Sequence, residues 1–355
     1  MKVAIVTDTH FGIRGDSQTM LAHQEKFFKE VFFPTCREHK IKHVIHPGDL
    51  VDRRKYINFN THQVMRKCFL DELKRRGMTM DLLAGNHDVY YKSTNRLNAL
   101  DELLRPYPNI TVFSDPTDSV QGDYRLCYIP WINSENEADT RRVIEQSRAQ
   151  ILFGHLELKG FEMFRGQKSE HGTIELPIFE KFDLVFSGHF HQKSTQGNIH
   201  YLGAPYQMTW SDWDCPRGFH ILNLETRELE FIPNPNQLFA KVFYDDTDMK
   251  YRELMDFEGI DFGGCYIKII VENKTNPLYF DHFVEAIEKM DPADVRVVEA
   301  LTQADSSDII NQAEDTQTIL MKSIDQMEMD PEVAKNVKTL LSELYTEAIN
   351  IEVDA

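Results

Sequence analysis

The chain has 355 residues, 41% of them hydrophobic, and a formal net charge of −18 at pH 7. This composition is typical of a globular protein of one to three domains. The sequence contains no run of 18 or more apolar residues and begins with a strand-like segment, so we expect neither a membrane span nor a signal peptide. Its five cysteines lie far apart without a CxxC pair, which argues against a disulfide framework or a thiolate zinc site and favours a cytoplasmic protein.

The negative charge is concentrated in the C-terminal third of the chain. Residues 1–244 contain 31 acidic and 30 basic residues, whereas residues 245–355 contain 26 acidic and nine basic residues. The first region is therefore nearly neutral, and the second has a net charge of −17. Because an acidic surface repels a polyanion, we expect the second region to bind protein and not nucleic acid.

The first two-thirds of the sequence predicts alternating strands and helices. The hydrophobic periodicity indicates strands within 2–10, 41–52, 78–88, 149–158 and 183–194, and amphipathic helices near 19–39 and 61–76. Further strands, expected to be antiparallel, lie within 198–207 and 217–232. Each of the first five strands ends in Asp, Asn or His, so the same design occurs five times.

The polar residues at these strand ends are candidate metal ligands, namely Asp8, His10, Asp49, Asn86, His155, His189 and His191. Ligand sites in α/β sheets collect beyond the carboxyl ends of the strands, so we expect all seven on one rim. Residues i and i+2 of a strand face the same side, so the His-x-His motif directs two imidazoles to one place. Mixed carboxylate, amide and imidazole ligands favour manganese, iron or zinc over magnesium or calcium. Seven ligands are too many for one ion and suit two ions with a shared carboxylate.

After residues 233–237 the pattern changes to a smaller α/β segment. It predicts strands within 266–272 and 295–301 and a helix at 278–290. A polar joint at 303–307 precedes two amphipathic helices within 308–350. The second of these helices has an apolar face made of Val333, Val337, Leu340, Leu341, Leu344 and Tyr345. Such a face packs within its own chain or binds a partner. The sequence therefore predicts three regions, at 1–237, 238–302 and 303–355.

Five motifs carry a family resemblance: Asp8-Thr9-His10, Gly48-Asp49, Gly85-Asn86-His87-Asp88, Gly154-His155 and Gly188-His189-Phe190-His191. In this order they resemble the calcineurin-like metallophosphoesterases. The whole layout is most similar to the SbcD family of double-strand-break nucleases, with specific likeness up to about residue 240. The resemblance implies a four-layer α/β sandwich of mixed sheets flanked by helices, a small α/β capping domain and a C-terminal helical hairpin.

The resemblance also implies a role for each motif residue. Asp8, His10, Asp49 and His191 would hold one divalent ion, most consistent with Mn²⁺. Asp49 would bridge to a second ion, which is also held by Asn86, His155 and His189. His87 would be the general acid that protonates the leaving oxygen. Asp52 would orient His87, although cellular relatives often have a histidine in place of Asp52, which leaves the supporting group open.

Three basic residues are candidates for phosphate or DNA contact. Arg53 lies where related phosphatases have a phosphate-binding arginine, and Arg54 and Lys92 lie close to it or to the third motif. The run of bases at 53–55 is equally compatible with a solvated loop. Of the histidines outside the motifs, only His46 is near enough to the rim to support the ligands.

The implied function is a manganese-dependent DNA exonuclease and endonuclease that processes double-stranded ends in recombination and repair. It would act with an SbcC-type coiled-coil ATPase, bound through the C-terminal hairpin, as a homodimer within a 2:2 heterotetramer. It would act in the cytoplasm, which is the host cytoplasm if a phage encodes the chain. Two alternatives stay open. A small-molecule phosphodiesterase or protein phosphatase is favoured by "GDLVDR" and by the lack of a basic surface, and a non-catalytic scaffold is disfavoured by the complete ligand set.

Overall fold

The computed structural model describes residues 1–164, 167–172 and 174–299, with the single positions 324, 333, 334, 337, 338, 340 and 341. The chain forms two compact units. The first comprises Met1–Tyr206 and Pro216–Asn236, and the second comprises Gln207–Cys215 and Gln237–Ala355. Most of the helical hairpin predicted within 308–350, including Leu344, lies outside the described residues.

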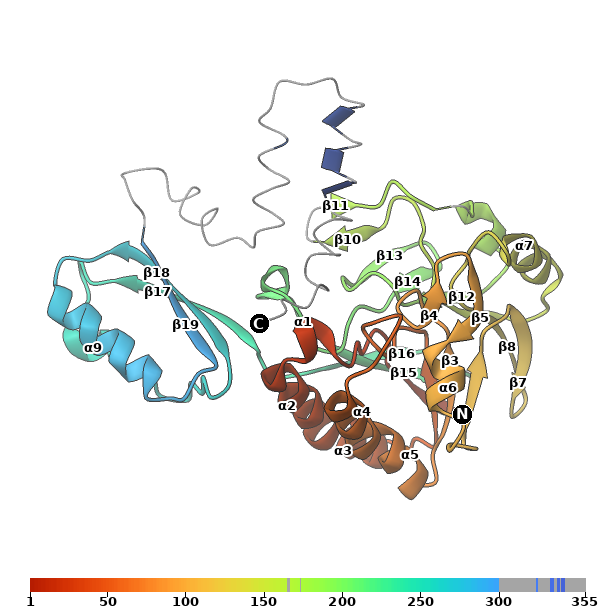
Figure 1. The fold of residues 1–355 in the computed structure, drawn as a ribbon, viewed down its shortest axis with the longest axis horizontal. Coiled ribbons are helices and arrows are strands. Elements are labelled where there is room, and N and C mark those ends of the chain that lie inside the picture. The colour runs from red at the N-terminus through yellow and green to blue at the C-terminus, as the bar shows by residue number, and fades with distance from the viewer. Residues whose placement is uncertain are drawn as a thin grey trace. The chain divides into compact units, whose positions relative to one another are not determined.

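The first unit is built on two six-stranded sheets (Figure 1). The first sheet has the order β16-β15-β1-β2-β3-β6, with the bounds β1 Lys2–Ile5, β2 His43–His46, β3 Thr79–Leu83, β6 Ile110–Phe113, β15 Gly218–Asn223 and β16 Leu229–Pro233. Strands β1, β2, β3 and β6 are parallel, and β15 is antiparallel to both β1 and β16. Parallel strands end on the same side, so the segments after β1, β2 and β3 meet at one edge.

The second sheet has the order β13-β14-β12-β9-β8-β7, with the bounds β7 Thr117–Gln121, β8 Tyr124–Ile129, β9 Ile151–Gly154, β12 Leu184–Ser187, β13 Ser194–Gln196 and β14 Ile199–Tyr201. Strands β8, β9, β12 and β14 are parallel, and the edge strands β7 and β13 are antiparallel to their neighbours. The expected antiparallel strand within 198–207 is thus only half right. The β13–β14 hairpin reverses the chain, so β14 is antiparallel to β13 and parallel to β12.

Helices cover the outer faces of the two sheets and complete four layers. One run joins α2 Gln18–Lys26, the π-helical η1 Phe27–Phe32 and α3 Phe33–Glu38, and a second joins α4 Phe59–Met65, the π-helical η2 Arg66–Leu70 and α5 Asp71–Arg75. Both runs lie on the first sheet (Figure 1), with Phe28 and Phe69 stacked at 4.4 Å between ring centroids. Helix α7 Glu137–Gln146 and the 3-10 turn η3 Leu176–Phe179 pack on the second sheet through Ile144 and Phe179. Ile45, Phe153 and Phe186 belong to the core between the sheets.

Short elements connect these layers. They are α1 Ile13–Asp16, the hairpin β4 Val89–Tyr91 and β5 Thr94–Asn98, α6 Ala99–Leu103, and the hairpin β10 Glu162–Phe164 and β11 Gln167–Lys168. The β4–β5 hairpin follows the third motif directly. No helix in the described part of the chain is long and apolar enough to cross a membrane.

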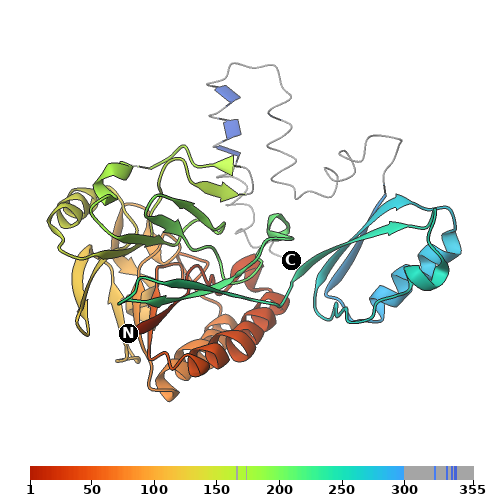
Figure 2. The same ribbon diagram turned by 180° about the vertical axis from the view of Figure 1, so that it is seen from behind.

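The second unit contains a parallel sheet of β17 Phe239–Asp245, β18 Tyr266–Asn273 and β19 Asp294–Glu299, with α8 Tyr251–Leu254 and α9 Pro277–Glu288. Helix α9 lies on one face of this sheet (Figure 2), where Phe283 and Ile287 pack against Ile267 and Ile269. It begins at the N-cap Asn276, whose side chain accepts hydrogen bonds from two backbone N–H groups, and Pro277 occupies its first turn.

The segment 207–215, with the short turn η4 Trp210–Asp212, belongs to the second unit although it lies within the predicted first region. The Gln207 side chain accepts hydrogen bonds from Leu238 and Phe239, each at 2.9 Å, and Trp210 packs on Phe239. These contacts bring together residues separated by about 30 positions, which strand patterns do not encode. Among the described positions of the C-terminal segment, Val333 and Leu340 are 50% and 56% exposed, and Val337 and Leu341 are half-buried.

Candidate metal centre

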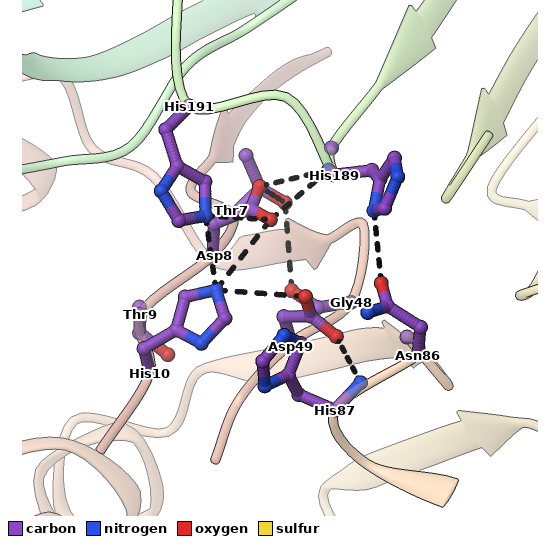
Figure 3. A network of polar contacts seen from close by, with 12 residues as sticks. Thr7, Asp8, Thr9, His10, Gly48, Asp49, Asn86, His87, His189 and His191 are labelled. Atoms are coloured by element: carbon purple, nitrogen blue, oxygen red, sulfur yellow. Dashed lines mark hydrogen bonds and ion pairs between the residues drawn. The ribbon is translucent and has the colours of Figure 1, made fainter. Parts of the chain in front are cut away.

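The seven candidate ligands gather at one place, but they come from both sheets. Asp8 and His10 follow β1, Asp49 follows β2 and Asn86 follows β3, all in the first sheet. His155 follows β9, and His189 and His191 follow β12, in the second sheet. Figure 3 shows six of these side chains directed toward one another, those of Asp8, His10, Asp49, Asn86, His189 and His191. The centre therefore lies where the carboxyl ends of two packed sheets meet, and not on the edge of a single sheet.

The backbone at the centre is held in an unfavourable conformation. Asp8, His10, Asp49 and His189 all have positive φ angles, between 41° and 83°. For residues other than glycine, such conformations cost roughly 1–3 kcal/mol each and persist where the surroundings enforce them. The neighbouring glycines allow close approach, because a Cβ on Gly85 would lie 2.1 Å from Asp49 Oδ1. The motif glycines thus make room for the ligands.

One group of ligands surrounds His10. Its Nε2 lies 3.1 Å from His191 Nε2, 3.5 Å from Asp49 Oδ2 and 3.9 Å from Asp8 Oδ1 (Figure 3). His191 Nε2 is also 3.9 Å from Asp8 Oδ1. The His10 Nδ1 faces the Asp52 carboxylate at 3.2 Å, so in the neutral ring Nδ1 carries the proton and Nε2 presents its lone pair to the group.

A second group surrounds Asn86. Its Oδ1 lies 2.8 Å from His155 Nε2 and 2.9 Å from His189 Nδ1, and His155 Nε2 lies 3.4 Å from Asp49 Oδ2. His155 Nδ1–H donates to the carbonyl oxygen of Pro47 at 2.8 Å, which leaves Nε2 as an acceptor when the ring is neutral. Asp49 takes part in both groups, as a bridging carboxylate would.

The donor set of each group fits a cation. Lone pairs of imidazole nitrogen, carboxylate oxygen and amide oxygen face one another at close range, which is unfavourable unless a positive charge lies between them. Asp8, His10 and His191 form one set of ligand atoms within 4.8 Å of one another, and Asp49, His155 and His189 form another. His87 joins a third such set with His10 and Asp49. Imidazole nitrogen, carboxylate and amide oxygen together suit a divalent transition metal ion.

The protonation of the side chains reflects the same crowding. Burial opposes charge on His10, but the hydrogen bond to Asp52 and the negative charge of Asp49 raise its pKa to about 9. Burial also opposes charge on His155, and Asp49 raises its pKa to about 9. Burial and the charge of His155 lower the pKa of His189 to about 3. Asp49 stays ionised, because its histidine neighbours outweigh burial and hold its pKa well below the usual value.

His87 contacts the main chain of Asp52, and not its carboxylate. Its Nδ1–H donates to the Asp52 carbonyl oxygen at 2.6 Å, and its backbone N–H donates to Asp49 Oδ1 at 2.8 Å. We expected the Asp52 side chain to orient His87, and this expectation needs correction, because that side chain points at His10. The loop conformation after β2 decides which group of Asp52 faces which histidine.

The three predicted phosphate-binding residues differ in their surroundings. Arg53 is buried in an ion pair with Asp16, at 2.8 Å, and its guanidinium also lies over the Tyr56 ring. Arg54 is half-buried, and its side chain makes no hydrogen bond or ion pair within the described residues. Burial lowers the pKa of its guanidinium, and the charge of Asp49 opposes this shift. Lys92 is exposed on the turn between β4 and β5. Of the three, Arg54 combines closeness to the centre with an unsatisfied charge.

Sequence reasoning assigned no role to Asp88, which anchors the loop that carries Asp49. Its fully buried carboxylate accepts four backbone hydrogen bonds, from the N–H groups of Asp49, Leu50, Val51 and Gly85 at 2.8–3.2 Å. Burial and the charge of Asp49 raise its pKa to about 7, although these donors favour the ionised form. The position of Asp88 in the third motif indicated a role at the centre. The motif alone does not distinguish a residue that binds metal from one that holds a loop in place.

Other buried polar side chains hold the segment after β1 in place. Gln24 on α2 donates to the carbonyl oxygens of Thr9 and His10, at 2.9 and 3.2 Å, and the Tyr206 hydroxyl donates to Thr9. His46 is fully buried, and its Nε2 lies 3.1 Å from the Thr9 hydroxyl, so it supports the ligands as expected. No sequence pattern marked Gln24 or Tyr206, because each acts across a distance in the chain.

Arg217 holds the segment after β12, where its guanidinium donates to the carbonyl oxygen of His191. Burial lowers the pKa of His191, and the charges of His10 and Arg217 lower it further. Arg217 lies in "DCPRGF", a stretch to which sequence reasoning gave no role.

Comparison with known proteins gives this centre a family. The profile of the calcineurin-like phosphoesterases matches residues 1–193. Exonuclease subunit 1 of Enterobacteria phage T4 is 30% identical over 354 residues, which span 98% of this chain and 99% of that protein. Among solved structures, an archaeal phosphodiesterase is 13% identical with a TM-score of 0.36 and covers 66% of this chain and all of that one. The purple acid phosphatase PPD1 of yellow lupin is 15% identical with a TM-score of 0.34 and covers 62% of this chain and 49% of that one.

These TM-scores are low, so the assignment rests on the two sequence matches. The profile covers more than half of the chain and includes every candidate ligand from Asp8 to His191. The relative from phage T4 matches over nearly the full length of both proteins. The protein belongs to the calcineurin-like phosphoesterase family.

Proposed function

We propose that this protein is the nuclease subunit of a DNA end-processing complex and hydrolyses phosphodiester bonds with two divalent ions, most consistent with Mn²⁺. The observation that carries the proposal is the match to Exonuclease subunit 1 of phage T4 over 98% of the chain. The geometry of the centre supports it, because all seven candidate ligands and His87 are brought together.

The proposed ligands divide into the two groups described above. Asp8, His10, Asp49 and His191 would hold the first ion, and Asp49, Asn86, His155 and His189 the second. Two such ions would supply positive charge to a bound phosphodiester and would lower the pKa of water at neutral pH. Imidazole and carboxylate ligands together favour manganese over magnesium. The protein contributes the fixed ligand positions, which Asp52, Pro47 and Asp88 maintain by their contacts to His10, His155 and the Asp49 loop.

His87 is the proposed general acid. Its Nδ1–H is bound to the Asp52 carbonyl oxygen, which fixes the ring. The imidazolium form then gives its Nε2 proton to the leaving oxygen and becomes the neutral ring with the proton kept on Nδ1. Such a proton transfer contributes typically about 10²–10⁴-fold to a rate. Arg54 and Lys92 are the proposed phosphate contacts. Arg53 is committed to Asp16, so we assign it to holding this loop.

The proposed partner is an SbcC-type coiled-coil ATPase, and the proposed substrate is double-stranded DNA ends. The described residues of the C-terminal segment include two exposed apolar side chains, Val333 and Leu340, which suit a helix-binding surface together with Val337, Leu341 and Leu344. The name of the phage T4 relative describes a subunit, which supports a partner. We further propose a homodimer within a 2:2 heterotetramer, acting in the cytoplasm, which is the host cytoplasm if a phage encodes the chain.

The test is Asp49→Ala, assayed on linear duplex DNA with the full chain in Mn²⁺, alone and with the ATPase. The substitution removes the shared carboxylate, so hydrolysis should fall to background while the far-ultraviolet circular dichroism is unchanged. A folded Asp49→Ala variant with the wild-type rate would overturn the two-ion proposal. Rapid hydrolysis of a cyclic nucleotide or phosphopeptide by the wild type, with no cleavage of DNA, would favour a small-molecule phosphodiesterase or phosphatase. The near neutrality of residues 1–244 is the observation that keeps that alternative in view.

A further inference from the structure

Trp131 lies beside the candidate metal centre, and the proposed chemistry gives it no role. It follows β8, within the stretch "YIPWINSEN". The centroid of its indole lies 5.2 Å from the ring of His189 and 6.1 Å from the ring of His155. These are two of the proposed ligands of the second ion, so the indole borders the place where a substrate phosphate would bind.

The position of Trp131 is fixed by three buried asparagines. The side-chain amides of Asn95 and Asn136 each donate to the Trp131 carbonyl oxygen, at 2.9 Å. Asn133 donates to Asn95 Oδ1 at 2.9 Å, and its backbone N–H donates to Asn136 Oδ1 at 2.8 Å. The backbone N–H of Trp131 donates to the carbonyl oxygen of Ala84. This network ties the loop after β8 to the β4–β5 hairpin, so the backbone of Trp131 is rigidly placed.

The indole is only half-buried, despite this rigid backbone. Within the described part of the chain, its ring N–H makes no hydrogen bond. A tryptophan that serves only as core is enclosed, and its buried N–H finds a partner. Trp131 instead keeps part of its ring and its ring N–H accessible at the rim of the centre. A rigid, accessible aromatic ring is the kind of surface on which nucleic-acid bases stack.

We propose that Trp131 forms a nucleobase subsite that stacks on the base of a nucleotide next to the scissile phosphate. This inference rests on the proposed nuclease function and adds a specificity-determining residue to it. Stacking tolerates any base, because every base has a π face, so the subsite selects for the presence of a base and not for its identity. The asparagine network is positioning machinery, because it acts on the substrate only through Trp131.

The test uses short single-stranded oligonucleotides of one sequence and the full-length chain in Mn²⁺. One oligonucleotide is intact and contains a single cleavable phosphate. A second carries an abasic analogue on the 5′ side of that phosphate, and a third carries it on the 3′ side. For the wild type, one of the two abasic substrates should show a KM raised roughly 5- to 150-fold, the range expected for the loss of one base–aromatic stack. Trp131→Ala should raise KM for the intact oligonucleotide by the same factor and remove the difference between intact and abasic substrates. Trp131→Phe should fall between the two.

Two controls separate the subsite from stability and from the proposed function. Leu97→Ala alters an apolar residue on the β4–β5 hairpin that is 42% exposed, and this variant should leave KM unchanged. Manganese content should be the same in wild type and Trp131→Ala. A Trp131→Ala variant that keeps both the wild-type KM and the wild-type difference in KM between intact and abasic substrates would overturn the subsite alone. A Trp131→Ala variant that loses its manganese would do the same. A wild-type protein that cleaves no oligonucleotide, alone or with the ATPase, would overturn the proposed function and the subsite together.

Discussion

Asp88 offers the sharpest test of how the fold supports the centre. Its carboxylate accepts two N–H groups at each oxygen, Leu50 and Val51 at Oδ1 and Asp49 and Gly85 at Oδ2. Asp88→Asn keeps the size of the side chain but replaces one oxygen by an NH₂ group. That group is a donor, so two buried backbone N–H groups lose their acceptor and face another donor.

The expected loss of stability follows from these two N–H groups. A buried donor left without a partner costs about 1–3 kcal/mol, so Asp88→Asn should lower the free energy of unfolding by about 2–6 kcal/mol. Native domains are stable by about 5–15 kcal/mol, so the variant should fold at low temperature but unfold at a lower denaturant concentration. Asp49 lies on the affected loop, so affinity for Mn²⁺ should fall as well.

The assay is urea unfolding with excess chelator at pH 8, followed by circular dichroism, with Mn²⁺ titration of the folded variant. This pH lies above the Asp88 pKa of about 7, so the wild-type carboxylate is ionised and accepts all four bonds. Asp123→Asn is the matched control, because Asp123 is exposed and its side chain makes no hydrogen bond among the described residues. If Asp88→Asn unfolds at the wild-type urea midpoint and binds Mn²⁺ equally well, the anchoring argument is wrong.

Three further predictions follow from the proposed roles. His87→Ala should keep its manganese, measured by elemental analysis, but its rate should fall by about 10²–10⁴-fold. If the variant loses manganese together with activity, His87 is a ligand. Asp52→Ala should lower the rate less than His87→Ala does. Mn²⁺ at a hundredfold excess over its Kd should raise the free energy of unfolding by about 2.7 kcal/mol per site relative to chelator, and no shift in the melting temperature would contradict a preformed metal site. Truncation after residue 302, or Leu340→Asp, should sharply reduce co-purification with the ATPase, while hydrolysis of a chromogenic phosphodiester persists. If either variant retains the ATPase fully, the segment after residue 302 packs within this chain's own core instead.

The sequence by itself determined the fold class and the set of residues at the centre. Strand ends are local features, because an apolar run followed by polar residues marks one, and in four of the five motifs a Gly stands between the two. Five such ends in order were sufficient for the family, which the profile over residues 1–193 supports independently. His46 was likewise placed from its position on a strand next to a motif, and it contacts Thr9 as a supporting residue.

Only the tertiary structure decided what each polar group faces. The pairing of β14 with β12, the burial of Arg53 against Asp16 and the turn of the Asp52 carboxylate toward His10 all depend on partners distant in sequence. The same holds for Gln24 and Arg217, whose side chains bind the backbone of ligand-bearing segments. Hydrophobic periodicity indicates which face of a helix or strand is buried, but it does not indicate which other element packs against that face. Hydrogen bonds and ion pairs depend on ångström-scale distances, which exist only once the chain has folded.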